Sequence, residues 1–125
     1  MPQNLNVLIV DDSSAIRKIL QRVLQQTELP IGTVYEAGDG MEAIAILKDK
    51  PVGLIFSDIN MPNMDGLQLL GNLRANDAWK QIPVLMITTE GSKAKVMEAL
   101  DLGAIGYVRK PFTPDQIKDK LVAFV

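Results

Sequence analysis

The sequence predicts a doubly wound α/β fold, in which helices cover both faces of one parallel sheet of five strands. Two observations support this fold. Five short apolar runs, suited to β-strands, alternate with longer segments that have helical spacing. The central runs are continuously apolar, which is typical of parallel strands buried on both faces. The five runs span residues 7–10, 34–35, 54–56, 84–87 and 107–108.

Helical segments follow these runs. After the first run, apolar residues recur at the i, i+3, i+4, i+7 spacing of one helix face, namely Ile16, Ile19, Leu20, Val23 and Leu24. Three later segments begin at residue types that commonly cap helices. These starts are Asp39 with Glu42 three positions on, Ser92, and Thr113 with Pro114 and Gln116. The segment 93–102 precedes Gly103, a residue type that favours a helix end.

Composition limits the classes of function. The chain has 125 residues, 47% of them hydrophobic and 22% charged, so we expect a single domain over residues 1–125 with no second domain. It contains no Cys and no His, which excludes disulfides, thiol catalysis, a His triad and a phosphohistidine on this chain. A net charge of −2 argues against nucleic-acid binding through bulk charge. No apolar stretch approaches the ~20 residues of a membrane span, so we expect a cytoplasmic protein.

Polar residues follow four of the predicted strands, where ligand sites of such sheets lie. They are Asp11, Asp12, Asp58, Thr88, Thr89 and Lys110. Three carboxylates at one edge repel one another unless a cation offsets them. Lys110 is one candidate cation, and a divalent ion is the other. Oxygen ligands without His or Cys favour Mg²⁺ over zinc. The alternative is that Asp11 and Asp12 cap the first helix and Asp58 only ends a strand.

Four motifs extend this interpretation across the chain. They are V-D-D at residues 10–12, S-D-I-N-M-P-N-M-D-G at 57–66, I-T-T-E at 87–90 and Y-V-R-K-P-F at 107–112. In this order and spacing, the sequence resembles the receiver domain of two-component response regulators, and most closely the single-domain chemotaxis regulators, which have no output domain. The resemblance implies a flavodoxin-like sheet with strand order 2-1-3-4-5. One departure is Ile59, where close chemotaxis relatives carry Trp; the single Trp79 lies elsewhere.

The resemblance implies a role for each residue at the strand ends. Asp58 matches the phosphoacceptor, and Asp11 and Asp12 match the acidic pair that holds Mg²⁺, with Mn²⁺ as an alternative. Asp58 and the backbone carbonyl of Asn60 complete the implied metal site. Thr88 and Lys110 match the side chains that contact the phosphoryl group, and the Lys110-Pro111 peptide bond matches one that is cis in the family.

Other positions match residues that control the phosphorylated state and its output. Asn60 and Glu90 match positions that tune hydrolysis, and their types resemble the fast-hydrolysing kind. Thr88 and Tyr107 match the pair that switches between states. The implied partner surface comprises Lys93, Val96, Tyr107 and Lys120. The alternatives are that Tyr107 is fixed packing and that the lysines are a solvated face.

The missing His requires a phosphorylated partner as donor, which the resemblance implies is a histidine kinase. The implied protein is a monomeric switch that catalyses only its own phosphoryl transfer and dephosphorylation. It signals through a downstream protein, with the flagellar switch as a candidate target and without nucleic acid or membrane. A receiver in another phosphorelay is an alternative. Two further alternatives are a Mg²⁺-dependent phosphatase of the haloacid dehalogenase type, which needs D-x-D after the first strand, and a flavodoxin-like FMN module, which needs a Thr/Ser/Gly-rich loop there. This chain has the adjacent pair Asp11 and Asp12 at that place, which meets neither requirement.

Overall fold

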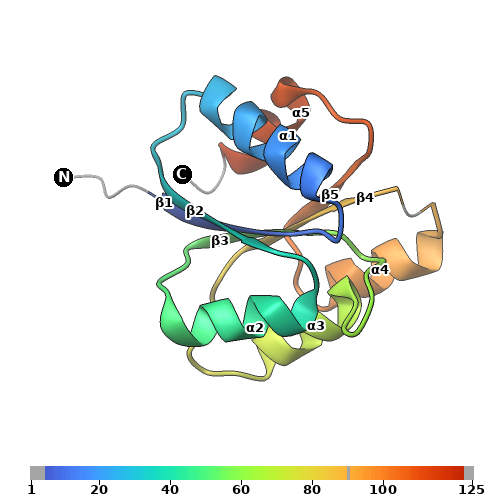
Figure 1. Cartoon of the computed structure of the whole chain (residues 1–125). Coiled ribbons are helices and arrows are strands. Elements are labelled where there is room, and N and C mark those ends of the chain that lie inside the picture. Colours follow the sequence, from blue (N-terminus) through green and yellow to red (C-terminus); the bar gives the residue numbers. More distant parts are fainter. Residues whose placement is uncertain (1–4, 90, 123–125) are drawn as a thin grey trace.

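The computed structural model describes residues 5–89 and 91–122. It forms one parallel sheet of five strands in the order β2-β1-β3-β4-β5, which confirms the predicted fold class (Figure 1). The strands are β1 (Leu5–Val10), β2 (Ile31–Ala37), β3 (Leu54–Ser57), β4 (Val84–Thr88) and β5 (Gly106–Arg109). The helices are α1 (Ser14–Gln26), α2 (Gly40–Asp49), α3 (Gly66–Arg74), α4 (Lys93–Asp101) and α5 (Pro114–Leu121).

Two apolar cores lie on the two faces of the sheet. In Figure 1, α1 and α5 cover one face, and α2, α3 and α4 lie on the other side. Leu8 and Val10 of β1 belong to the core that includes α2 and α3, whereas Val7 and Ile9 belong to the core that includes α1 and α5. Successive side chains of a strand point to opposite faces. Both sets are therefore buried, which explains the continuously apolar runs.

Helix starts follow the local signals in the sequence. The side chains of Asp39, Ser92 and Thr113 each accept a hydrogen bond from the backbone N–H three residues on, as predicted. At α2 the Glu42 carboxylate reaches back to the Gly38 N–H. Two further caps were not predicted: Ser13 for α1 and Asp65 for α3. Because Ser13 caps α1, the alternative that Asp11 and Asp12 cap this helix is wrong.

The element bounds depart from the predicted runs mainly at the sheet edges. Strand β2 is longer than the two residues seen in the sequence, because it is an edge strand that mixes half-buried apolar positions with the exposed Thr33 and with Glu36. Strand β5, the other edge, alternates buried and exposed residues. Helix α4 ends at Asp101, and Gly103 follows with a φ of +94°. Within the described residues, no helix has the length and apolar character needed to cross a bilayer.

Candidate metal and phosphoryl site

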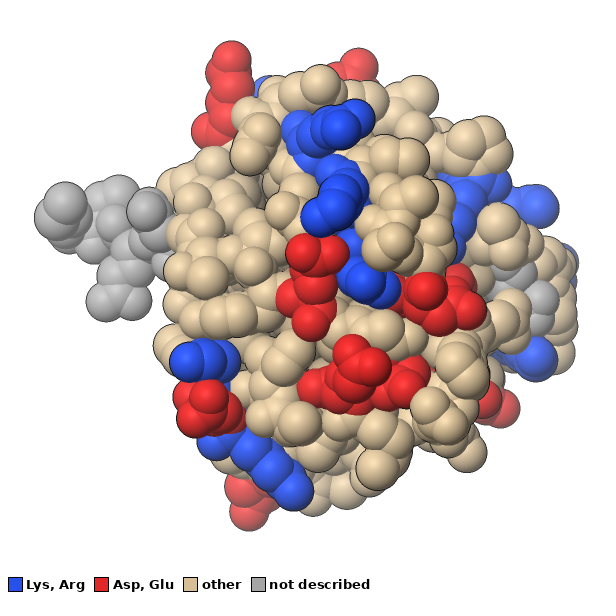
Figure 2. All heavy atoms as spheres, viewed as in Figure 1, with Lys and Arg blue, Asp and Glu red and all other residues tan. Residues whose placement is uncertain are grey.

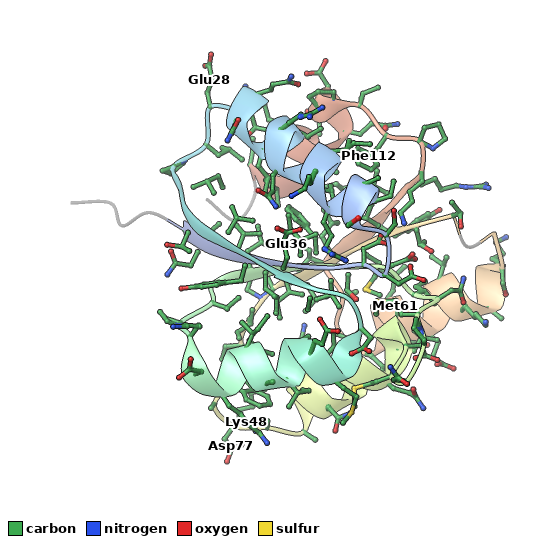
Figure 3. All side chains as sticks on the ribbon, viewed as in Figure 1. Glu28, Glu36, Lys48, Met61, Asp77 and Phe112 are labelled. Atoms are coloured by element: carbon green, nitrogen blue, oxygen red, sulfur yellow. The ribbon has the colours of Figure 1, made fainter. Side chains whose placement is uncertain are left out.

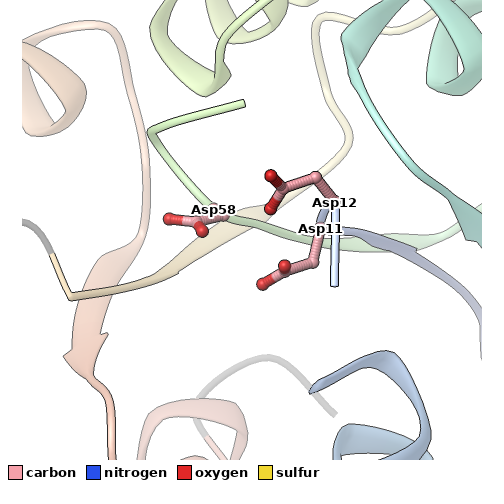
Figure 4. A group of neighbouring side chains, drawn as sticks. All are labelled: Asp11, Asp12 and Asp58. Atoms are coloured by element: carbon pink, nitrogen blue, oxygen red, sulfur yellow. The ribbon is translucent and has the colours of Figure 1, made fainter. Parts of the chain in front are cut away.

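Three carboxylates meet at the carboxyl ends of β1 and β3. Val10 pairs with Ser57 in the parallel register, so the next residues, Asp11 and Asp58, lie side by side. One carboxylate oxygen each from Asp11, Asp12 and Asp58 lies within 4.8 Å of the other two (Figure 4). Asp11 and Asp58 are buried and Asp12 is exposed, so the cluster opens to solvent on the side of Asp12.

Lys110 supplies the positive charge of the cluster. Its backbone N–H donates to the Thr88 carbonyl at 3.0 Å, which fixes the chain where β5 ends. The Lys110 Nζ lies 2.6 Å from Asp11 Oδ2 and 3.0 Å from Asp58 Oδ2. The Lys110-Pro111 peptide bond is cis, as the resemblance implied. Four of the predicted strand-end residues therefore converge, although Lys110 is 99 positions from Asp11; they are Asp11, Asp12, Asp58 and Lys110.

The pKa values of two of these groups reflect the shared site. Burial raises the pKa of Asp11, although hydrogen bonds from Lys110 and from the Ser13 N–H act in the opposite direction. Burial alone would lower the pKa of Lys110, but its hydrogen bonds to Asp11 and Asp58 outweigh burial and raise that pKa. Lys110 is therefore held in its charged form between two carboxylates.

The donor set of this cluster fits a hard divalent cation. With all three carboxylates ionised, one ammonium leaves two negative charges uncompensated within a few ångströms. Carboxylate oxygens without thiolate or imidazole suit Mg²⁺ or Mn²⁺. The exposed Asp12 gives a hydrated ion access from solvent. This edge of the sheet therefore holds an acidic pocket that suits such an ion.

The loop after β3 turns sharply at Asp58. The Asp58 Oδ1 accepts a hydrogen bond from the Ile59 N–H at 2.7 Å, and the Ile59 carbonyl accepts one from the Gly66 N–H at 2.8 Å. A Cβ on Gly66 would lie 2.0 Å from the Asp58 carbonyl oxygen, so the start of α3 packs directly on the backbone of this aspartate. Asn60 is exposed at the outer part of the loop.

Strands β4 and β5 carry the predicted switch pair. Thr88 is the last residue of β4 and is fully buried. Tyr107 lies on β5 opposite Met86, and its side chain is exposed, with a relative accessibility of 40%. Glu90, predicted to tune hydrolysis, lies outside the described residues.

Two hollows flank Tyr107 on the face formed by α4, β5 and α5. One, of about 300 Å³, is lined by Lys93, Val96, Met97 and Tyr107, among others. The second, of about 570 Å³, is lined by Tyr107, Gln116 and Lys120, among others. All four residues predicted for a partner surface therefore border one continuous face. The sequence prediction missed Arg109, which lines both hollows. The available signal was its place two residues after Tyr107 on an edge strand whose residues alternate between buried and exposed.

Arg17 is a second residue that the sequence prediction missed. Its guanidinium donates to the backbone carbonyl of Asp11 and, at 3.0 Å, to the carboxylate of Glu36 on β2. Burial would raise the pKa of Glu36, but the hydrogen bonds from Arg17 and Gln21 lower it. Arg17 therefore links the turn that contains Asp11 and Asp12 to strand β2. Glu36 of β2 is labelled in Figure 3. The position of Arg17 one helical turn after the cap Ser13 was the available signal.

Acidic and basic side chains are interspersed on the face shown in Figure 2.

Trp79 lies between α3 and β4, before the amino end of β4. It is partly buried and packs against the core that includes α2 and α3. Because the carboxylates lie at the carboxyl ends of the strands, Trp79 lies toward the opposite, amino ends of the strands.

The fold and the site together define a doubly wound α/β domain with a cation site at the carboxyl edge of its sheet. The chain belongs to the response regulator receiver domain family, whose model matches residues 7–122. It is 41% identical over 119 residues to the chemotaxis protein CheY-3 of Vibrio cholerae serotype O1, covering 95% of this chain and 90% of that protein. It is 43% identical over 118 residues to a chemotaxis protein CheY homolog of Campylobacter jejuni, covering 94% and 89%.

Solved structures give the same result. The chemotaxis response regulator CheY4 of Vibrio cholerae matches with a TM-score of 0.85 and 36% identity, over 98% of this chain and all of that one. The complex of CheX, CheY, BeF₃ and Mg²⁺ from Borrelia burgdorferi matches with a TM-score of 0.86 and 32% identity, over 98% of this chain and 91% of that one. The chain is thus a receiver domain homologous to CheY chemotaxis regulators and a signalling switch rather than a conventional enzyme. The phosphatase and flavin-module alternatives are not favoured.

Proposed function

We propose that this chain is a stand-alone receiver that accepts a phosphoryl group on Asp58 from a histidine kinase. The convergence of Asp11, Asp12, Asp58 and Lys110 at one edge of the sheet supports this proposal most directly. No other arrangement in the described residues combines a nucleophile, a cation site and a fixed ammonium group. The phosphodonor comes from a partner because the chain contains no His.

The proposed transfer needs little beyond positioning and neutralisation of charge. An Asp58 carboxylate oxygen attacks phosphorus, a new O–P bond forms, and the P–N bond of the donor phosphohistidine breaks, leaving its electron pair on the imidazole nitrogen. Bound Mg²⁺ would supply charge neutralisation, held by Asp11, Asp12, Asp58 and the Asn60 carbonyl. Lys110 pairs with a phosphoryl oxygen in place of Asp58, and the Thr88 hydroxyl donates to another.

Small-molecule phosphorylation tests this proposal without knowledge of the kinase. The intact chain is incubated with acetyl phosphate and MgCl₂ and then treated with borohydride, which reduces an aspartyl phosphate to homoserine with release of phosphate. Peptide mass mapping locates the homoserine. We expect one modification, at Asp58, that disappears when EDTA replaces MgCl₂. Modification at another aspartate, or equal modification in EDTA, would contradict the proposed function.

Mg²⁺ affinity is expected to respond in opposite directions to loss of Asp12 and loss of Lys110. Asp12→Ala removes a carboxylate and should weaken Mg²⁺ binding by at least about tenfold. Lys110→Ala removes a cation that lies 2.6 Å and 3.0 Å from two carboxylates, so Mg²⁺ should bind several-fold more tightly. Calorimetric titration measures both. Equal affinity in wild type and Asp12→Ala would place the metal elsewhere.

We further propose that Thr88 and Tyr107 transmit phosphorylation to the face of α4, β5 and α5. Movement of the Thr88 hydroxyl toward a phosphoryl group on Asp58 vacates space beside β5, and the exposed ring of Tyr107 turns into it. A free-energy difference of a few kcal/mol between the two states is sufficient for phosphorylation to shift the equilibrium between them. This turn would reshape both hollows that Tyr107 lines.

Thr88→Ala is expected to keep phosphorylation of Asp58 and to lose most of its effect on this face. Fluorine NMR of fluorotyrosine at Tyr107, with and without beryllofluoride and Mg²⁺, measures the response. Wild type should show a shifted resonance on addition of beryllofluoride, and Thr88→Ala should show a smaller shift. An unchanged Tyr107 resonance in wild type would mean that the ring is fixed packing.

The phosphorylated state is expected to be short-lived, because Asn60 leaves room for water beside the phosphoryl group. Asn60 is exposed on the loop after β3, so Asn60→Arg should fold normally and place a bulky cation near the path of water. We expect dephosphorylation to slow by about tenfold. Release of inorganic phosphate after removal of the donor measures this rate. Faster release from Asn60→Arg would reverse the assignment.

The wider role is proposed from the relatives. The Borrelia burgdorferi structure holds a CheY with CheX, BeF₃ and Mg²⁺. We propose that this chain likewise acts as a cytoplasmic monomer that binds a downstream protein, with the flagellar switch in chemotaxis as the leading target, rather than nucleic acid or membrane. A receiver in another phosphorelay remains the second candidate, and pull-down with the beryllofluoride-loaded chain distinguishes them by the partner recovered.

A further inference from the structure

The loop between β3 and α3 is held from outside by the start of α2. The Asp39 carboxylate, which caps α2 through the Glu42 N–H at 2.9 Å, accepts a second hydrogen bond from Asn63 Nδ2 at 2.7 Å. Beside it, the Gly40 N–H donates to the Met64 carbonyl at 3.0 Å. Two consecutive residues at the start of α2 are therefore hydrogen-bonded to two consecutive residues of the loop, Asp39 to Asn63 and Gly40 to Met64.

Other observations show that this contact is close and specific. Asn63 has a φ of +65°, a backbone conformation that Asn adopts more readily than most residues. A Cβ on Gly40 would lie 2.6 Å from the Met64 side chain, so only glycine allows the approach seen here. The hydrogen bond from Asn63 is the main cause that lowers the pKa of Asp39. This hydrogen bond therefore favours the charged form of the Asp39 carboxylate, although the residue is buried.

The outer part of the loop has little burial to fix its position. Asn60, Pro62 and Asn63 are exposed, whereas the loop's two ends, Asp58 and Gly66, are buried. The inner end is tied by the Ile59 and Gly66 backbone bonds described above. The Asp39–Asn63 bond ties the outer end. Along the chain, Asn60 lies between these two attachments. Figure 3 shows the next residue, Met61, on the side of the molecule where the strands have their carboxyl ends.

We propose that Asp39 and Asn63 are positioning residues for the metal site: their hydrogen bond sets the loop so that the Asn60 carbonyl faces the carboxylates. This inference rests on the proposed Mg²⁺ site and adds residues outside it. Neither side chain contacts the ion. Their contribution is to lower the cost of ordering the loop when the carbonyl binds, because the loop is already held in that conformation.

The test is calorimetric titration of the full chain with MgCl₂ alone, without a phosphodonor. Asn63→Gly removes the amide, tolerates the positive φ and leaves the net charge unchanged. We expect its Mg²⁺ dissociation constant to rise about tenfold. Asn76→Gly is the matched control, because it also removes a hydrogen-bonded side-chain amide. The Asn76 Oδ1 accepts a hydrogen bond from the Ala78 N–H at 2.8 Å, but Asn76 lies between α3 and β4. The Mg²⁺ affinity of this control variant should equal that of wild type.

A charge swap separates positioning from a general loss of stability. Asn63→Asp alone places a second carboxylate beside that of Asp39. The two negative charges repel each other, so this variant should bind Mg²⁺ more weakly. Asp39→Asn with Asn63→Asp restores one donor and one acceptor at wild-type net charge, and Asn caps helices as well as Asp does. The double variant should regain most of the lost affinity.

Hydrogen exchange of the Gly40 amide, measured without metal, gives a second readout. It should quicken in Asn63→Gly and not in Asn76→Gly, because the Gly40–Met64 bond depends on the position of the loop. If wild type binds Mg²⁺ and Asn63→Gly binds within twofold as tightly, this inference is wrong and the metal site stands. If wild type binds no Mg²⁺, the proposed metal site and this inference both fail.

Discussion

Asp58→Asn is expected to abolish incorporation of phosphate from acetyl phosphate, while leaving the fold intact. Asn keeps the shape of the side chain and an Oδ1 that can accept the hydrogen bond from the Ile59 N–H, which lies 2.7 Å from that atom in the wild type. It lacks the nucleophilic carboxylate, so no acyl phosphate can form. Intact-mass spectrometry directly after the incubation detects the phosphoryl adduct of the wild type and its absence in Asp58→Asn, and circular dichroism checks the fold.

Asp77→Asn is the matched control for this substitution. Asp77 is almost fully exposed beside Lys80, in the segment between α3 and β4, and Figure 3 shows it at the base of the molecule. This variant should incorporate phosphate like wild type. Full labelling of Asp58→Asn would show that another residue accepts the phosphoryl group, and the assignment of Asp58 would be wrong.

Gly66→Ala is expected to destabilise the fold strongly. The added Cβ would lie 2.0 Å from the Asp58 carbonyl oxygen and 2.9 Å from the Ile59 Cα, and both neighbours are backbone atoms that cannot rotate away. Relief requires α3 or the loop to shift, at a cost of about 3 kcal/mol in the free energy of unfolding. The same shift would move Asp58, so Mg²⁺ affinity should also fall. Urea unfolding and calorimetric titration measure the two effects.

Gly71→Ala in the same helix provides the opposite expectation. Apart from the adjacent residues and the backbone of the helix itself, no atom lies within 4 Å of the Cβ position at Gly71, so the substitution adds helix propensity without a clash. We expect it to raise the free energy of unfolding by about 0.8 kcal/mol and to leave Mg²⁺ affinity unchanged. Equal stability of the two variants would show that the contact between α3 and the Asp58 backbone is loose.

Features that depend on neighbours in sequence were predicted well. The caps at Asp39, Ser92 and Thr113 involve the backbone three residues on, so the residue types alone indicate them. The fold class followed from the alternation of apolar runs with helical segments. The edge strand β2 was predicted too short, because half-buried positions there include polar residues that mask the pattern.

The approximate site was also predictable from the sequence. Parallel strands bring their carboxyl ends to one edge, so residues after β1, β3 and β5 had to meet once the fold class was known. Asp11, Asp58 and Lys110 do meet there, although the sequence left open which cation, lysine or metal, offsets the carboxylates.

Contacts between side chains and distant loops were decided only by the tertiary structure. The bonds of Arg17 to the Asp11 carbonyl and of Asp39 to Asn63 depend on the direction of each side chain after the helices have packed. Arg74 likewise donates to four backbone carbonyls in two loops. The sequence by itself determined which elements form and which strand ends carry charge, because those follow from local propensity and burial on both faces. Packing determined how the loops are held, because a hydrogen bond across loops needs atoms placed to within a few tenths of an ångström.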